Sequence, residues 1–173
     1  GAGKSTTIKM LTGLLSPSEG SIIFQGQQLS RSDYQRQLGV VFQDSILDQD
    51  LTVGQNLLNR AKCYRNSEAS QLDFLIQVFE LESILKQSYG TLSGGQRRRV
   101  DIARALVHQP KFLILDEPST GLDIQTRNVI WDALLRLRQE QGLTILLTTH
   151  YLEEVENADF VYIIDHGHLI AAD

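Results

Sequence analysis

Two adjacent carboxylates, Asp116 and Glu117, follow directly after the apolar run 112–115. A carboxylate at the end of a buried strand can hold Mg²⁺ through its water shell, and we assign this role to Asp116. A neighbouring carboxylate can orient and deprotonate an attacking water, and we assign this role to Glu117. Because an acidic turn after a core strand has the same composition, the pair indicates phosphate chemistry only in combination with other motifs of the chain.

The chain begins with a glycine-rich run that matches the second half of the phosphate-binding loop pattern G-x-x-x-x-G-K-[ST]. The run consists of Gly1, Ala2, Gly3, Lys4, Ser5 and Thr6. Glycines let the backbone wrap closely around phosphates, and the N-terminus of the following helix supplies free N–H groups and a partial charge of about +0.5. We expect Lys4 to reach the terminal phosphates of a nucleotide and the Ser5 hydroxyl to bind Mg²⁺. Because the first glycine of the pattern and the strand before it are missing, we interpret the sequence as cut within this loop.

A second glycine-bearing turn opens a helix in the middle of the chain. It consists of Leu92, Ser93, Gly94, Gly95 and Gln96. The start of such a helix offers backbone N–H groups and a serine hydroxyl to an anion, which is weak alone but strong as a second clamp on a phosphate already held. The arginine run 97–99 follows, and we expect it to form a solvated helix face. Since the chain carries a net charge of −5, we expect no nucleic-acid partner.

The composition is that of an ordinary globular domain, with 173 residues of which 42% are hydrophobic and 21% charged. No apolar run approaches the roughly 20 residues needed to cross a bilayer, and no secretory signal is visible, so we expect a cytosolic chain. Cys63, the one cysteine, cannot form an internal disulfide. We interpret His166 and His168, which stand at strand spacing, as a surface pair rather than a metal site.

The hydrophobic periodicity predicts an α/β fold with a parallel sheet. The expected helices are 5–15, 93–107, 125–140 and 151–156, together with a helical stretch over 52–85. The expected strands are 21–24, 38–42, 112–115, 144–148 and 160–164. The last three strands are continuous apolar runs, which is typical of strands covered on both faces. We expect one domain over residues 1–173, with a core formed by 1–43 and 111–173 and a helical subdomain formed by 44–110.

The order of the motifs resembles that of the ATPase subunit of ATP-binding cassette transporters. In chain order the motifs are GAGKST, VVFQ, LSGGQ, ILDEP, STGLD and TTH. The resemblance extends over nearly the whole chain. It implies a P-loop NTPase (RecA-like) core with an inserted α-helical subdomain, the first strands of that core lying before Gly1. It also implies ATP and Mg²⁺ as cofactors.

The resemblance implies further roles for matching residues. Gln43 corresponds to the glutamine that senses Mg²⁺ and the attacking water, and His150 to the switch histidine that contacts the γ-phosphate. Residues 93–95, with Gln96 in the same signature motif, correspond to the turn that closes over ATP held by a second subunit. Asp123 corresponds to the aspartate that crosses the dimer interface. Two ATP molecules would then lie between two chains.

Three segments, 41–53, 92–106 and 148–154, resemble multidrug exporters of the daunorubicin-resistance type. This resemblance implies two partners, a second ATPase subunit and an integral membrane permease, and a peripheral location at the cytoplasmic face of the cell membrane. A soluble cassette ATPase that acts on ribosomes or DNA is an alternative, and a catalytically silent cassette that serves as an interaction module is another. The residues do not identify the transported substrate.

Overall fold

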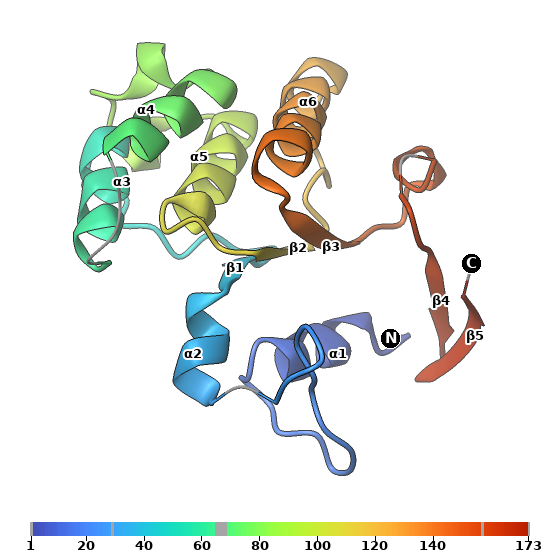
Figure 1. Ribbon diagram of the computed structural model, residues 1–173. Helices are drawn as coiled ribbons and strands as arrows, with labels where there is room; N and C mark the ends of the chain where they lie inside the picture. The colour runs from blue at the N-terminus through green and yellow to red at the C-terminus, as the bar shows by residue number, and fades with distance from the viewer. Residues whose placement is uncertain (1, 29, 65–68, 157, 173) are drawn as a thin grey trace.

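The computed structural model describes residues 2–28, 30–64, 69–156 and 158–172 (Figure 1). The α-helices are α1 (Lys4–Leu11), α2 (Arg31–Arg36), α3 (Val53–Lys62), α4 (Ala69–Val78), α5 (Gly94–Leu106) and α6 (Ile124–Gln141). The strands are β1 (Leu38–Val41), β2 (Phe112–Asp116), β3 (Thr144–Thr148), β4 (Tyr162–Asp165) and β5 (His168–Ala172). Short 3₁₀ helices are Glu82–Ile84, Tyr89–Thr91 and Leu152–Glu154.

A parallel sheet with the strand order β1–β2–β3 lies at the centre of the fold. Its register pairs Val41 of β1 with Leu115 of β2, and Leu115 with Leu147 of β3. Leu113, Ile114 and Leu115 of the central strand have no exposed surface. Burial on both faces explains why β2 is a continuous apolar run rather than an alternating one. The predicted parallel α/β sheet is confirmed.

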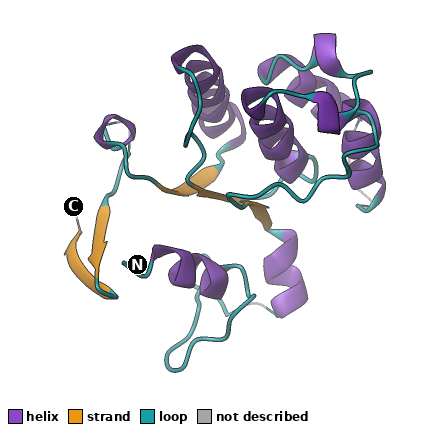
Figure 2. Ribbon diagram, turned by 180° about the vertical axis from the view of Figure 1, so that it is seen from behind, coloured by secondary structure: helices purple, strands orange, loops and turns teal. Residues whose placement is uncertain are grey.

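Helices cover both faces of this sheet, as the two opposite views show (Figures 1 and 2). On one face, α3, α4, α5 and α6 share a hydrophobic cluster with Leu113 and Leu115. On the other face lie α1 and α2. Ile8 of α1 and Ile114 are both buried outside that cluster, as expected when successive strand residues point to opposite faces. The packing therefore needs apolar residues at consecutive positions of β2.

Side-chain caps begin the helices that carry the motifs. Thr52 before α3 and Ser93 before α5 each form a capping box with the glutamine three residues later. Asp123 caps α6, which ends at Gly142 in the left-handed conformation. The predicted helices 93–107 and 125–140 are thus confirmed to within one or two residues, and their starts are fixed by local hydrogen bonds.

One predicted strand is absent, and another forms but lies outside the expected sheet. Residues 21–24 form no strand, because Phe24 makes only an isolated bridge to Gln27 within a tight turn. The run 160–164 becomes β4, which lies outside the parallel sheet and pairs antiparallel with β5. His166 and Gly167, both at positive φ, form the two-residue loop between β4 and β5.

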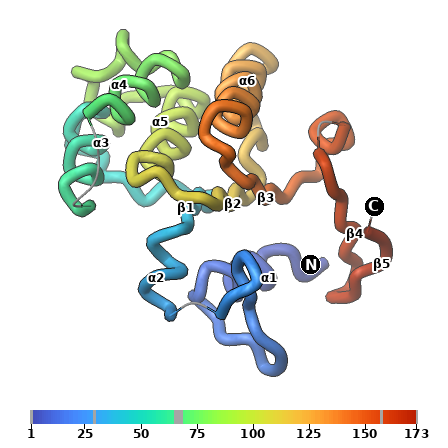
Figure 3. The backbone as a smooth tube through the Cα atoms, in the orientation of Figure 1, coloured from blue at the N-terminus to red at the C-terminus, as the bar shows by residue number. Residues whose placement is uncertain are grey.

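The surface of this hairpin also differs from the expectation that 160–164 is covered on both faces. Tyr162 is 59% exposed and Ile163 is 53% exposed. The tube view shows the hairpin to one side of the sheet, next to the start of α1 (Figure 3). The predicted helix 5–15 is also shorter than expected, since α1 ends at Leu11 and the chain turns at Gly13 with φ 74°. In the described part of the chain, no helix is both long and apolar enough to cross a bilayer.

His108 gives a testable pH dependence of stability. Burial lowers the pKa of its imidazole to about 4 from an ordinary value near 6.5. As the pH falls from 6.5 to 4, the unfolded chain binds a proton at this histidine before the folded chain does, so the free energy of unfolding decreases. Urea unfolding at pH 7 and pH 5 should show this decrease, and it should be smaller for His108→Gln. His166→Gln, at an exposed position, is the control, and equal pH dependence in all three proteins would contradict the assignment.

Candidate functional site

The carboxyl ends of the three parallel strands bring together motifs that are far apart in the sequence. Gln43 follows β1 by two residues, Glu117 comes directly after β2, and His150 follows β3 by two residues. In a parallel sheet these loops leave from the same edge. Gln43 is exposed at this edge. The sheet thus carries three of the predicted site residues on neighbouring loops.

Lys4, His150 and Glu117 form a continuous chain of polar contacts. Nζ of Lys4 lies 3.1 Å from Nδ1 of His150, and Nε2 of His150 lies 2.5 Å from Oε1 of Glu117. Since an ammonium can only donate, Nδ1 accepts and Nε2 carries the hydrogen that is donated to the carboxylate. The predicted phosphate-loop lysine, switch histidine and general base therefore meet at one place.

Glu117 occupies an unusual backbone conformation, with a φ of 47°. This left-handed region is uncommon for a residue other than glycine and persists only where the surroundings hold it. The Glu117 N–H lies 3.1 Å from Oγ1 and 3.2 Å from the carbonyl oxygen of Thr148, and it donates to both. Thr120 Oγ1 donates to the second carboxylate oxygen of Glu117 at 3.3 Å. The side chain is thereby directed towards His150.

Thr148 and Glu154 are residues of this region that the sequence analysis missed. Thr148 is the strand partner of Asp116, and its Oγ1 donates to Asp116 Oδ1 at 2.6 Å. Glu154 is buried and accepts a hydrogen bond from Ser119 Oγ, which joins the segment after His150 to the segment after Glu117. Both residues lie in the segment 148–154 that carries the family resemblance, but the sequence alone does not indicate the partners Asp116 and Ser119.

The phosphate-loop residues lie at the start of α1. Gly3, with φ 101°, precedes the helix, and none of the described side chains caps its N-terminus. No acidic residue occupies the first turn, and Ser5 and Thr6 are exposed. Ala2 accepts a backbone hydrogen bond of 2.9 Å from Gly167 of the hairpin turn. Uncapped N–H groups beside Lys4 suit an anion.

Gly1, the first residue of the predicted phosphate loop, lies outside the described residues.

Residues 92–96 form the turn that opens α5, called the signature turn below. Ser93 Oγ accepts from the Gln96 N–H at 3.3 Å, and the Gln96 side chain accepts from the Ser93 N–H at 2.9 Å. The Gln96 side chain is thus engaged in capping α5. A Cβ on Gly94 would meet no atom within 4 Å, whereas a Cβ on Gly95 would lie 2.8 Å from two side-chain atoms of Thr126. Gly94 is therefore the open face of the turn, and Gly95 its packed face.

Asp123 lies at the start of α6, and both of its carboxylate oxygens accept local hydrogen bonds. Its Oδ1 accepts from the Thr126 N–H and its Oδ2 from Thr126 Oγ1, both at 2.8 Å. These bonds from Thr126 hold the pKa of the exposed Asp123 carboxyl below its ordinary value. Since Thr126 also packs on Gly95, the segment that carries Asp123 lies against the signature turn.

The arginine run 97–99 is not a solvated face, so that expectation is wrong. Arg97 Nε donates to the Leu92 carbonyl at 3.0 Å, and Arg99 Nη1 donates to the Phe79 carbonyl at 2.8 Å. Arg98 is only 8% exposed and donates to backbone carbonyls of other segments. The guanidinium groups are therefore turned inward to backbone oxygens, which a charge run alone does not reveal.

Comparisons with known proteins agree with this arrangement. The sequence model of the family described as ABC transporter matches residues 1–120. Nod factor export ATP-binding protein I from Burkholderia pseudomallei is 44% identical over 177 residues, which cover 99% of this chain and 58% of that protein. The structure of cbiO1 from Clostridium perfringens, part of the ABC transporter complex cbiONQ, has a TM-score of 0.85 at 30% identity and covers 99% of this chain and 72% of that one.

A dimeric ATP-binding cassette in a post-hydrolysis state, bound to ADP and Pi, has a TM-score of 0.85 at 28% identity, covering 99% of this chain and 80% of that one. The chain belongs to the ABC transporter family, and its fold is that of the family's P-loop NTPase cassette. The resemblance recognised in the sequence is confirmed. The chain spans 54–58% of the length of the curated relatives it matches.

The contrast between the two signature glycines is testable by alanine substitution. Gly95→Ala should lower the free energy of unfolding by about 1–3 kcal/mol relative to Gly94→Ala, because its methyl group would overlap Thr126. Urea unfolding of both variants measures this difference. Adding Thr126→Ala to Gly95→Ala removes the overlapping atoms and should recover part of the loss. Equal stability of the two glycine variants would contradict the close packing of α5 on Thr126.

Proposed function

We propose that this chain is the ATP-binding and ATP-hydrolysing part of an ABC exporter. The observation that carries the proposal is the contact of Lys4 with His150 and of His150 with Glu117, which joins residues as far as 146 positions apart. A chance assembly of a lysine, a histidine and a carboxylate would not fall on three family motifs at once. Relatives named as ATP-binding proteins of Nod factor export support the exporter assignment.

The donor set fits a nucleotide with Mg²⁺. The uncapped start of α1 and the Lys4 ammonium suit the β- and γ-phosphates. The Ser5 hydroxyl, the Gln43 amide and the Asp116 carboxylate are oxygen ligands of the kind that Mg²⁺ prefers, and we propose that they hold it. When bound, Mg²⁺ would neutralise charge on the phosphate oxygens. Residues 1–6 would line the phosphates.

In the proposed hydrolysis reaction, each side chain at the sheet edge has a distinct role. Glu117 accepts a proton from the attacking water as the water oxygen bonds to the γ-phosphorus and the bond to the bridging oxygen breaks. His150 orients Glu117 through its Nε2 hydrogen and faces the γ-phosphate with Lys4. Gln43 positions the water. Lys4 stabilises the negative charge that remains on the phosphates.

We propose that the working unit is a dimer in which each signature turn completes the partner's site. Ser93 and Gly94 present a hydroxyl and an open backbone surface, which is the geometry needed to accept an incoming phosphate. Gly95 and Gln96 shape the turn, and Asp123 lies beside it. The dimeric cassette bound to ADP and Pi, to which this chain is similar, supports the proposal.

The membrane partner is the second part of the proposal. We propose that the chain binds an integral membrane permease at the cytoplasmic face of the membrane, with no nucleic-acid partner. Two similar proteins support this, since one is named for export and the other is part of a transporter complex. We propose the division into a core (1–43 and 111–173) and a helical subdomain (44–110). Co-purification with a membrane protein supports the exporter, whereas co-purification with ribosomes or DNA would support the soluble alternative.

Replacing the general base should separate ATP binding from hydrolysis. Glu117→Gln keeps the size of the side chain but cannot accept the proton, so kcat should fall by roughly 10²- to 10⁴-fold while the Kd for ATP stays close to that of the wild type. Steady-state phosphate release and calorimetric ATP titration measure the two effects. Glu82→Gln, at an exposed position on the helical side, is the matched control. Wild-type turnover in Glu117→Gln would refute the assignment of the base.

A charge at the signature turn should block dimer formation without unfolding the helix. Ser93→Asp keeps a good helix cap but places a carboxylate where the partner's γ-phosphate is proposed to bind. Light scattering with ATP, in the Glu117→Gln background, should show dimers for the parent and monomers for Ser93→Asp. Thr52→Asp makes the same change at the capping box of α3 and should leave the dimer intact. An intact dimer in Ser93→Asp would contradict the role of the turn.

A further inference from the structure

Arg98 joins three segments that the proposed reaction needs. Its Nη1 donates to the Phe42 carbonyl at 2.6 Å, its Nη2 to the Asp116 carbonyl at 2.8 Å and its Nε to the Pro118 carbonyl at 2.9 Å. The side chain belongs to the first half of α5, the helix that begins with the signature turn. One guanidinium therefore connects that helix with the loops after β1 and β2.

The three carbonyls stand next to the two residues whose positions matter most. Phe42 directly precedes Gln43, so the first bond fixes the peptide that leads into the glutamine. Asp116 and Pro118 flank Glu117, so the other two bonds hold the backbone on both sides of the residue at φ 47°. Left-handed backbone at a non-glycine residue needs such external support. Arg98 supplies it from outside the loop.

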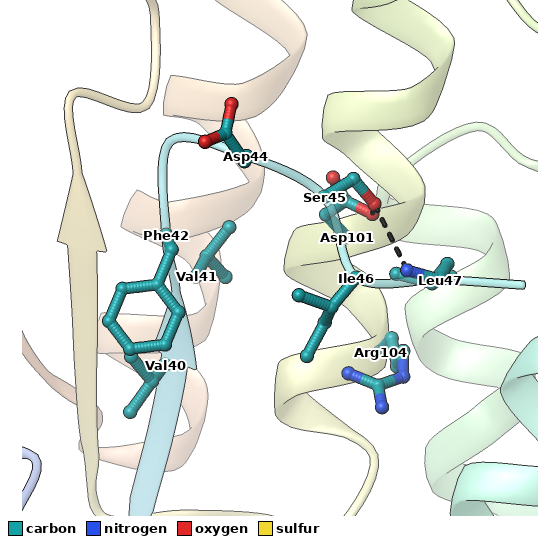
Figure 4. A pocket seen from close by; sticks show the side chains of 9 residues that line it. All are labelled: Val40, Val41, Phe42, Asp44, Ser45, Ile46, Leu47, Asp101 and Arg104. Carbon is teal, nitrogen blue, oxygen red and sulfur yellow. Dashed lines mark hydrogen bonds between the residues drawn. The ribbon is translucent and has the colours of Figure 1, made fainter. Parts of the chain in front are cut away.

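The same face of α5 holds the Gln43 segment at a second point. Asp101, one helical turn after Arg98 and also 8% exposed, accepts hydrogen bonds from Ser45 at 3.0 Å and from Tyr89 at 2.7 Å. Figure 4 shows the loop after β1 crossing from Phe42 to α5, where Ser45 lies beside Asp101. Gln43 thus lies between two anchors on one helix face, one on each side of it along the chain.

The chemistry of the position favours a specific role over simple space filling. A guanidinium presents its N–H donors in a rigid fork, which allows three separate carbonyls to be served at once, whereas an ammonium is a compact point charge on a flexible stem. Removing a guanidinium from water carries a desolvation penalty that an apolar side chain would avoid. Burial accordingly lowers the pKa of Arg98, and the negative charges of Asp101 and Asp116 offset part of this decrease.

We propose that Arg98 is a positioning residue for ATP hydrolysis, which fixes the backbone beside Gln43 and around Glu117 relative to the signature helix. The proposal rests on the proposed ATPase function. Because α5 begins at the turn that meets the partner's nucleotide, the Arg98 bonds transmit the position of that turn to the water-activating residues of the same chain.

Arg98→Lys in the full-length protein tests this proposal. The variant keeps the positive charge but has a single nitrogen in place of the three that bond to Phe42, Asp116 and Pro118. We therefore expect kcat to fall by roughly 10- to 100-fold with KM for ATP unchanged, because small misplacements of catalytic groups cost up to about 10²-fold. Arg99→Lys is the matched control, since the neighbouring arginine also bonds to backbone carbonyls, at Phe79 and Glu80, away from Gln43 and Glu117. It should keep the wild-type kcat.

A second measurement separates positioning from a general loss of structure. In a Gln43→Ala background, Arg98→Lys should reduce kcat by a smaller factor than in the wild type, because part of its effect passes through Gln43. An equal factor in both backgrounds, or equal kcat for Arg98→Lys and Arg99→Lys, overturns the proposal. An inactive wild-type protein overturns the ATPase function and this proposal with it.

Thermal unfolding of each variant accompanies the kinetics. If Arg98→Lys does not fold at the assay temperature, Arg98→Gln, which removes the charge but keeps two N–H donors, is judged by the same criteria. Failure of both variants to fold, with Arg99→Lys folded, would assign Arg98 to stability alone and overturn the positioning role.

Discussion

The parallel register of β1, β2 and β3 is the constraint on which the site depends. Because Asp116 pairs with Thr148, the loops after β2 and β3 leave the sheet at the same level, and β1 sends Gln43 to the same edge. A slip of one residue would turn each side chain to the opposite face. The observed register therefore also sets Glu117 and His150 next to each other.

Backbone groups make most of the connections around this edge. The Glu117 N–H bonds to Thr148, and the carbonyls on either side of Glu117 bond to Arg98. Such bonds fix where a loop lies without using the polar side chains that must face a substrate. The loop after β2 consequently has little freedom to move apart from β3 and α5. Lys4, the first residue of α1, contacts His150 from the face of the sheet opposite to α5.

Much of the fold and of the site could be predicted from the sequence, because the motifs are short and locally encoded. The helix after Ser93 and the buried strand before Asp116 need only nearby residues, and both were predicted with nearly correct bounds. The position of 160–164 could not be predicted, since an apolar run does not indicate which strand it pairs with. The inward contacts of Arg98 could not be predicted, because a charge run on a helix gives no sign of carbonyls contributed by distant segments.

A crystal structure of the full-length protein with Mg²⁺ and a non-hydrolysable ATP analogue tests most directly whether these loops form one nucleotide site. The account predicts that the terminal phosphate lies within hydrogen-bond distance of Lys4 Nζ and beside the His150 ring, with the metal on Ser5 and the Glu117 carboxylate facing the γ-phosphorus. A nucleotide bound away from the start of α1, or one bound there with His150 and Glu117 turned away from it, would contradict the account.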